Sequence, residues 1–334
     1  MSARASVIPV FVPHWGCEHA CVFCNQRHIT GQRTPATAHT VQKAMSQAAA
    51  LPPGAKRQLA FYGGSFTAIP VARQEELLAA AQPYLASGAL SSLRLSTRPD
   101  ALDAETLARL RRYGVATIEL GAQSMEDRVL ALSGRGHTAA DVERAAALVK
   151  GAGFELVLQM MTGLPGDSDA GALRTAEKLI ARQPDGVRIY PTVIVRDTAL
   201  CELWKAGRYR EHTVEDAVRV CAMLLPRFEA AGIPVIRLGL NPTEELSGGE
   251  AVGGAYHPAL GELVKSRLHR NRAEELLDGV EPGSRVVLGV NTRELSQMIG
   301  QHRSNLDWLR DRFALSGITV RSAPVNSGEI CRIS

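Results

Sequence analysis

The chain has 334 residues, 45% of them hydrophobic, and a formal net charge of +4. This length allows a sizeable hydrophobic core and suggests one large domain and one small one. No apolar run reaches the roughly 18 residues that a membrane-spanning helix requires, so an integral membrane protein is excluded.

The first apolar stretch, residues 6–13, is short and interrupted by prolines, so it predicts a strand rather than a signal peptide. Six cysteines are too sparse in a chain of this length for the disulfide framework of a small secreted protein. We therefore expect a cytoplasmic protein with no membrane partner. The mildly basic charge does not by itself indicate a nucleic-acid-binding protein.

Strand-like and helix-like segments alternate between residues 7 and 240. Short β-branched runs that end in Gly, Ser or Pro predict strands at 7–12, 57–66, 91–100, 115–124, 154–166, 185–195 and 233–240. Apolar residues spaced near 3.6 predict helices at 38–51, 71–85, 103–114, 139–153, 170–183 and 213–232. About six such units predict a parallel α/β sheet, and they fit a partial (β/α)6 TIM-like barrel better than a closed eight-fold one. A doubly wound open sheet is the alternative.

The pattern changes after residue 240. A Gly-rich loop over 241–259 has the length of a functional segment or a domain joint. It is followed by a basic helix at 260–277, a strand at 285–290, helices at 292–299 and 304–314, and a strand at 317–322. The sequence thus predicts a first domain of 1–240 and a small α/β accessory domain of 241–334.

Polar and Gly-rich residues follow the ends of five consecutive strands. They are the cysteines of 17–24, Gly63 to Ser65, Ser96 to Arg98, Gly121 to Ser124, and Gly163 to Gly166. Parallel α/β folds bind ligands at the carboxyl ends of their strands. These signals therefore predict one shared pocket.

Cys17, Cys21 and Cys24 are spaced C-x3-C-x2-C in the loop after the first strand. A structural zinc site needs a fourth ligand, which His14, His19 or His28 would have to supply. Short cysteine runs of this kind also hold iron–sulfur clusters. A four-iron cluster with three cysteines leaves one iron open to a small ligand that chelates through an amine and a carboxylate.

The cysteine loop after the first strand and the Gly pair after the second resemble the radical S-adenosylmethionine (SAM) superfamily. The resemblance implies a partial barrel of the radical SAM type. It also implies a 4Fe-4S cluster on the three cysteines, at which S-adenosyl-L-methionine is reductively cleaved to a 5′-deoxyadenosyl radical. An electron donor of the flavodoxin or ferredoxin type would be a partner.

The same resemblance implies positions that contact SAM. The aromatic residue before the third cysteine would pack against adenine, the Gly pair would receive the methionine amino group, and residues after strands three to five would contact ribose, carboxylate and adenine. These positions are Phe23, Gly63, Gly64, Ser65, Ser96, Thr97, Arg98, Gln123, Ser124, Met160, Met161 and Leu164. Ordinary turns and core packing are the alternative roles for these residues.

A closer resemblance covers much of residues 60–210. The segments "FYGGSFTAIP", "STRPDAL", "ELGAQSMEDRVL", "GRGHT", "QMMTGLPGD" and "PDGVRIYPTVIVRDTALCELWKAGRY" are similar to the catalytic subunit of elongator. That family modifies the wobble uridine of transfer RNA (tRNA) with acetyl-CoA. The last ninety or so residues show no pattern of the family's acetyltransferase domain, so we do not expect use of acetyl-CoA. Oxygen-independent coproporphyrinogen oxidases share a weaker version of these segments.

The strand–helix–helix–strand order over 285–322 resembles a minimal KH unit, which clamps a nucleic-acid backbone with a G-x-x-G loop. Here the loop runs from Gly300 to Arg303, so arginine replaces the second glycine. Lys265 and Arg267 on the preceding helix would add phosphate contacts. The alternative is a small accessory domain with a solvated basic face.

Arg188 and Tyr190 end the sixth strand and are candidate catalytic residues at the pocket mouth, although a structural hydroxyl is the alternative for Tyr190. Three functions remain open at this point. The first is a radical SAM enzyme acting on RNA, with a tRNA base as substrate. The second is the same chemistry on a small metabolite or tetrapyrrole, and the third is a non-catalytic metal-cluster RNA-binding module.

Overall fold

The computed structural model describes residues 6–12, 20–25, 34–48, 56–244 and 246–333. Two compact units make up the chain. The first comprises Met1–Thr213 and Pro226–Tyr256, and the second comprises Val214–Leu225 and His257–Ser334. The segment 241–256 groups with the first unit in this division, whereas the domain boundary expected from the sequence lies after residue 240.

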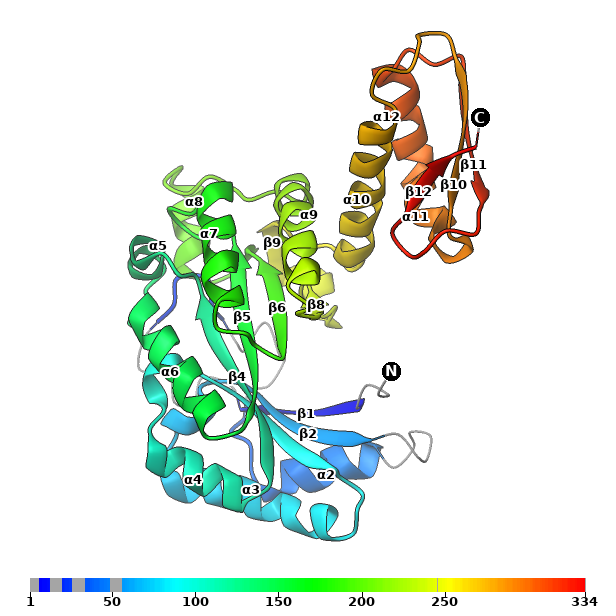
Figure 1. Cartoon of the computed structure of the whole chain (residues 1–334). Coiled ribbons are helices and arrows are strands. Elements are labelled where there is room, and N and C mark those ends of the chain that lie inside the picture. The colour runs from blue at the N-terminus through cyan, green and yellow to red at the C-terminus, as the bar shows by residue number, and fades with distance from the viewer. Residues whose placement is uncertain (1–5, 13–19, 26–33, 49–55, 245, 334) are drawn as a thin grey trace. The chain divides into compact units, whose positions relative to one another are not determined.

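A seven-stranded parallel sheet in the order β1-β2-β3-β4-β5-β6-β8 forms the centre of the first unit (Figure 1). Its strands are β1 (Ser6–Val12), β2 (Arg57–Gly63), β3 (Ser92–Thr97), β4 (Val115–Gln123), β5 (Glu155–Thr162), β6 (Gly186–Pro191) and β8 (Val235–Leu238). The helices along this part of the chain are α2 (Ala38–Ala48), α3 (Val71–Ala86), α4 (Ala104–Arg112), α5 (Asp127–Leu132), α6 (Ala139–Gly151), α7 (Asp169–Ile180), α8 (Ala199–Lys205) and α9 (Val214–Ala230). The predicted fold class, a partial α/β barrel, is confirmed.

The two faces of the sheet differ in polarity. In β3, Leu93 and Leu95 are fully buried, whereas Arg94 and Ser96 on the opposite face are only partly buried. Successive side chains of a strand point to opposite faces, and parallel strands usually bury apolar residues on both. The polar face of β3 therefore borders a cavity instead of a packed core.

Side-chain caps start the helices that follow the strands. Asp103, Thr138, Ser168 and Thr198 each accept a hydrogen bond from a backbone N–H in the first turn of α4, α6, α7 and α8. Such caps satisfy N–H groups that have no partner within the helix, and each contributes about 1 kcal/mol. They determine the residue at which each loop after a strand ends and the following helix begins.

One predicted strand, 185–195, is wrong as a single element. It divides into β6 and β7 (Val193–Val195), and β7 pairs antiparallel with β9 (Ala251–Gly254). The break lies at Thr192, whose N–H donates to the Thr162 carbonyl and whose carbonyl accepts from the Ala255 N–H. The short helices α5 and α8 were not predicted either.

The second unit contains a three-stranded sheet in the order β11-β10-β12. Its elements are α10 (Leu260–Leu276), β10 (Arg285–Val290), α11 (Leu295–Ile299), α12 (Ser304–Arg312), β11 (Gly317–Ser322) and β12 (Ile330–Arg332). The predicted order strand–helix–helix–strand is present, and β12 is an addition to it. Leu288, Met298 and Leu309 are fully buried between sheet and helices. Within the described ranges, no helix combines the length and apolarity needed to cross a membrane.

Candidate functional site

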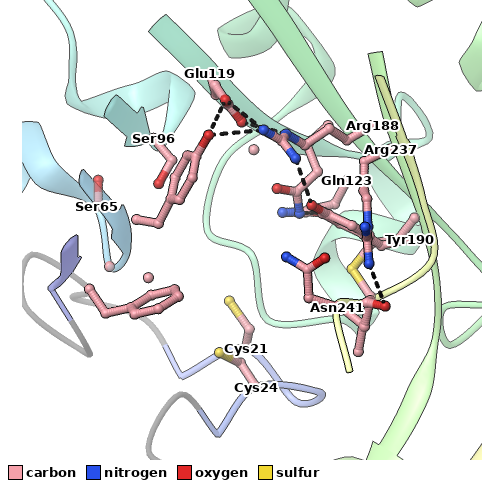
Figure 2. Close-up of a pocket in the computed structure, with 18 of the residues that line it drawn as sticks. Cys21, Cys24, Ser65, Ser96, Glu119, Gln123, Arg188, Tyr190, Arg237 and Asn241 are labelled. Atoms are coloured by element: carbon pink, nitrogen blue, oxygen red, sulfur yellow. Dashed lines mark hydrogen bonds and ion pairs between the residues drawn. The ribbon is translucent and has the colours of Figure 1, made fainter. Parts of the chain in front are cut away.

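A cavity of about 760 Å³ lies at the inner face of the sheet in the first unit (Figure 2). Its volume falls within the roughly 300–1,000 Å³ that is typical of ligand pockets. It is lined by side chains of all seven strands and of the loops that follow them. The predicted site residues among them are Cys21, Phe23, Cys24, Gly63, Gly64, Ser65, Ser96, Thr97, Arg98, Gln123, Met161, Arg188 and Tyr190.

Three other predicted SAM contacts do not line this cavity. Met160 lies on the opposite face of β5 from Met161 and is fully buried. Ser124 is buried and its Oγ lies 3.3 Å from the Thr175 hydroxyl. Leu164 is buried and packs against Met161, which itself lines the cavity.

The cysteine loop is anchored by backbone hydrogen bonds to the C-terminal end of α5 and to the first turn of α8. The Val22 N–H donates to the Ser133 carbonyl, and the Val22 carbonyl accepts from the Leu200 N–H. Cys21 and Cys24 both border the cavity, and the Cys24 N–H donates to the Cys21 carbonyl. Cys17, His14, His19 and His28 lie outside the described residues. Among the described residues, no group of three His, Cys, Asp or Glu side chains could hold a metal ion.

Gly134 lies next to this loop, and its substitution is expected to reduce iron binding. It has a φ of 65°, and a Cβ there would lie 3.0 Å from the Ala20 carbonyl oxygen. Gly134→Ala should lower the iron content of anaerobically reconstituted protein, because the alanine pushes the cysteine loop away. Iron and sulfide assays on the purified protein measure this.

Gly207→Ala is the matched control for Gly134→Ala. Gly207 has a φ of 67°, and no atom lies within 4 Å of the position of its Cβ. Both substitutions place alanine in the left-handed region at a cost of about 1–2 kcal/mol. Equal iron contents in the two variants would show that the contact with Ala20 does not matter.

Arg135 connects the cysteine loop to β4. Its Nη1 donates to the Cys21 Sγ at 3.2 Å and its Nη2 donates to the Gly121 carbonyl at 2.8 Å. Its Nε is buried and has no hydrogen-bond partner among the residues that the structure describes. A guanidinium in this position can donate a charge-assisted hydrogen bond to a thiolate, which is the form of cysteine that binds metals.

The loops after β2 and β3 are joined through Ser65. Its hydroxyl lies 2.9 Å from the Thr97 hydroxyl and accepts from the Arg98 N–H at 3.1 Å. Gly63 has a φ of 106°, a conformation that favours glycine, so only backbone borders the cavity there. The Arg98 guanidinium makes two hydrogen bonds to the Asp100 carboxylate, at 2.9 and 2.5 Å.

A hydrogen-bonded network centred on Glu119 occupies the end of the cavity away from the cysteines (Figure 2). Arg188 donates to both carboxylate oxygens of Glu119, at 2.7 and 3.0 Å. Arg94 donates to the same carboxylate at 2.8 Å, and the Tyr62 hydroxyl does so at 2.7 Å. Arg94 also donates to the Gln58 side-chain oxygen. The Glu119 carboxylate is thus the shared acceptor and counter-charge of two guanidinium groups.

The environment fixes the protonation states in this network. Burial opposes ionisation of Glu119, but Arg188 and Arg94 outweigh it and hold its pKa below the usual value. Burial, and then the Glu119 charge, raise the pKa of Tyr62, and burial raises that of Tyr190. At neutral pH the carboxylate is therefore charged and both tyrosines keep their protons.

Arg237 and the segment after β8 complete the wall next to Arg188. Arg237 is the register partner of Arg188 on the adjacent strand, and Asn241 follows it along the lining. Sequence reasoning missed Glu119, Arg94 and Arg237 as site residues. The signal for all three was a charged residue inside a predicted parallel strand, where apolar residues are the rule.

The four predicted RNA-binding residues lie in the second unit. Lys265 pairs with Glu262 at 3.0 Å, and Arg267 pairs with Glu215 at 2.5 Å, so acidic neighbours offset both charges. Gly300 has a φ of 77°, and a Cβ there would lie 2.7 Å from the Ser304 Oγ. Arg303 adopts a φ of 67° at the position of the missing second glycine.

Comparisons with known proteins fit this geometry. Residues 12–179 match the Radical SAM superfamily, and residues 184–270 match the Radical_SAM C-terminal domain. Elongator complex protein 3 of Mus musculus is 36% identical over 139 residues, which cover 40% of this chain and 25% of that protein. The tRNA uridine(34) acetyltransferase of Methanocaldococcus infernus is 31% identical over 132 residues, covering 39% and 25%. Both matches thus span a quarter of the relative's own length.

One solved structure supports the fold assignment, and only that assignment. The archaeal Methanocaldococcus infernus Elp3 with an N-terminal deletion superposes with a TM-score of 0.64 at 22% sequence identity. The superposition covers 80% of this chain and 63% of that chain. At this identity the likeness shows a shared architecture, and any shared substrate has to be argued separately.

Proposed function

This chain belongs to the radical SAM superfamily and is a radical SAM enzyme. We propose that it modifies a base of transfer RNA. The similarity to a protein named tRNA uridine(34) acetyltransferase, and to Elongator complex protein 3, carries this proposal. The proposal extends to a cytoplasmic location and to an electron donor of the flavodoxin or ferredoxin type.

Family membership implies a 4Fe-4S cluster and S-adenosyl-L-methionine. When bound, they supply the reductive cleavage of a carbon–sulfur bond that yields a 5′-deoxyadenosyl radical. The residues present fit such a cluster, because two thiols border the cavity and Arg135 donates to one of them. We assign Cys21, Cys24 and Cys17, which lies outside the described residues, as its ligands.

The SAM side of the cavity is proposed to consist of the loops after β1 to β5. Gly63 and Gly64 offer backbone to the ligand, since no side chain intervenes there. Figure 2 shows Ser65 and Ser96 on one side of the cavity and Gln123 closer to its centre. The proposed SAM contacts on the lining are Phe23, Gly63, Gly64, Ser65, Ser96, Thr97, Arg98, Gln123 and Met161.

Arg135 is expected to raise the reduction potential of the cluster. Hydrogen bonds and positive charge at a ligating sulfur favour the reduced, more negative state. Arg135→Gln should lower the midpoint potential on the order of 60 mV, the shift that a tenfold change in a one-electron equilibrium produces. A redox titration followed by electron paramagnetic resonance measures it. An unchanged potential would contradict the prediction, and Arg196→Gln, an exposed arginine outside the lining, is the control.

The second unit is proposed to hold the RNA backbone. Its strand–helix–helix–strand order and the left-handed conformations at Gly300 and Arg303 support a KH-like loop. Lys265 and Arg267 on α10 would add phosphate contacts in exchange for their present carboxylate partners. Arg303→Glu should weaken tRNA binding in a filter-binding assay, whereas unchanged binding would argue for a structural accessory unit.

Anaerobic turnover with total tRNA tests the proposed function. The cluster-loaded protein is incubated with SAM and dithionite, and the tRNA is digested to nucleosides for mass spectrometry. We expect a nucleoside of altered mass together with tRNA-dependent formation of 5′-deoxyadenosine. If 5′-deoxyadenosine forms at the same rate without tRNA and no nucleoside changes, tRNA is not the substrate.

A further inference from the structure

The lining of the cavity carries more positive than negative charge. Among the described residues five arginines line it, and Glu119 is the single carboxylate that does so. The arginines are Arg94, Arg98, Arg135, Arg188 and Arg237. Arg98 is neutralised by Asp100, which lies outside the lining, and Arg135 faces the Cys21 sulfur. For the remaining three arginines, Glu119 is the one carboxylate on the described lining.

The wall formed by β6 and β8 carries two of these three arginines, Arg188 and Arg237. Arg94 and Arg188 both pair with Glu119, so one of these two charges is left over. The Arg237 guanidinium donates hydrogen bonds to the backbone carbonyls of Gly239 and Leu240, both at 2.9 Å. Across the described ranges of the chain, it makes no ion pair with a carboxylate. Among the described residues, Arg94, Arg188 and Arg237 together carry two more positive charges than Glu119 offsets, and Arg237 has no carboxylate partner.

Arg188 and Arg237 are positioned so that one ligand group can contact both side chains. They are register partners on neighbouring parallel strands, and both line the cavity, so their side chains leave the sheet on the same face. Figure 2 shows Arg237 beside Tyr190 and Asn241, across the cavity from Ser65 and Ser96. This wall is thus separate from the loops proposed to hold SAM.

Partly buried cations without a counter-charge are costly unless a ligand supplies one. Guanidinium groups match the planar geometry of carboxylate and phosphate oxygens and form strong, charge-assisted hydrogen bonds with them. We propose that an oxyanion of the substrate, phosphate or carboxylate, binds between Arg188 and Arg237. For an RNA substrate, which rests on the function proposed above, this anion is a backbone phosphate next to the reacting nucleotide.

Three matched nucleosides test the site in the full-length, cluster-loaded protein with saturating SAM and no reductant. Uridine, uridine 5′-monophosphate and uridine-5′-carboxylic acid differ only at the 5′ position, and calorimetry gives their affinities. At least one of the two anions should bind about 10-fold more tightly than uridine, as expected for one charge-assisted contact. A stronger effect of the phosphate identifies a phosphate site, and a stronger effect of the carboxylate identifies a carboxylate site.

Three variants decide whether Arg237 is responsible. Arg237→Gln should abolish the preference for the anion, Arg237→Lys should keep most of it, and Arg196→Gln should leave it unchanged. Equal affinities for the three nucleosides, including no measurable binding of any, would overturn the proposal. So would a preference that survives in Arg237→Gln, or one that Arg237→Lys loses to the same extent, because the positive charge would then not be the cause.

The turnover assay separates this proposal from the proposed function. Formation of a modified tRNA nucleoside without any preference for anions would refute only the oxyanion site. A clear preference for uridine 5′-monophosphate, combined with turnover that does not depend on tRNA, would refute only the choice of tRNA as substrate.

Discussion

Glu119→Gln is expected to destabilise the first unit by about 3–5 kcal/mol, the cost of removing one partner of a buried ion pair. The Glu119 side chain is 3% exposed, and its partners Arg94 and Arg188 are 12% and 15% exposed. Glutamine keeps the shape but presents an amide N–H₂ to two guanidinium groups that need an acceptor. Urea unfolding followed by hydrogen-exchange mass spectrometry of β4 peptides isolates the first unit from the second.

Glu126→Gln is the matched control for this change. Glu126 also has two cationic partners, but Arg174 and Lys178 are 52% and 46% exposed. Exposed ion pairs contribute about 0–1 kcal/mol, so this variant should unfold nearly as the unmodified protein does. Similar losses in the two variants would mean that burial of the Glu119 network adds nothing to stability.

The pH dependence of the Glu119→Gln effect follows from the pKa of Glu119. Its pKa is held below the usual value in the folded chain, so the ionised carboxylate stabilises the fold. This contribution is fully present above the unfolded pKa, about 4.3 for a glutamate, and is lost as the pH falls through the folded pKa. The stability difference between Glu119→Gln and the unmodified protein should therefore be constant near neutral pH and shrink in acid.

Local patterns were sufficient to predict the layout of the sheet. Seven strands and the helices between them follow from runs of β-branched residues and from apolar spacing near 3.6, both of which are local signals. The pairing of β7 with β9 was not predictable in this way. Its partner strand lies more than fifty residues later in a Gly-rich segment, and nothing near Val193 indicates that the chain leaves the sheet at Thr192.

The cavity residues also differ in whether a local sequence pattern predicts them. The cysteine loop and the Gly pair are contiguous motifs, so the sequence alone indicated them. The Arg188–Glu119 contact joins residues 69 positions apart, and it forms only because β4 and β6 flank β5 and point these side chains inward. A charged residue in a strand becomes a site residue once the sheet curls around it, and that curvature is a property of the assembled barrel.

Cys24→Ala is expected to lower the formation of 5′-deoxyadenosine by at least about 100-fold, since changes to residues that only support metal ligands already cost 10–100-fold. Cys24 is partly buried, borders the cavity and stands in the predicted ligand motif. Anaerobic reconstitution followed by liquid chromatography of the SAM cleavage products measures the effect. Iron content should fall in parallel.

Cys331→Ala separates loss of a ligand from general loss of a thiol. Cys331 is also partly buried and free of disulfides, but it lies on β12 in the second unit. If Cys24→Ala retains its iron and its SAM cleavage, then the cysteine loop does not hold the cluster. The roles assigned to Arg135 and to the glycine pair would then lose their common basis, because both depend on a cluster held by Cys21 and Cys24. A defect confined to Cys24→Ala, with Cys331→Ala active, would place the start of the reaction at the cysteine loop.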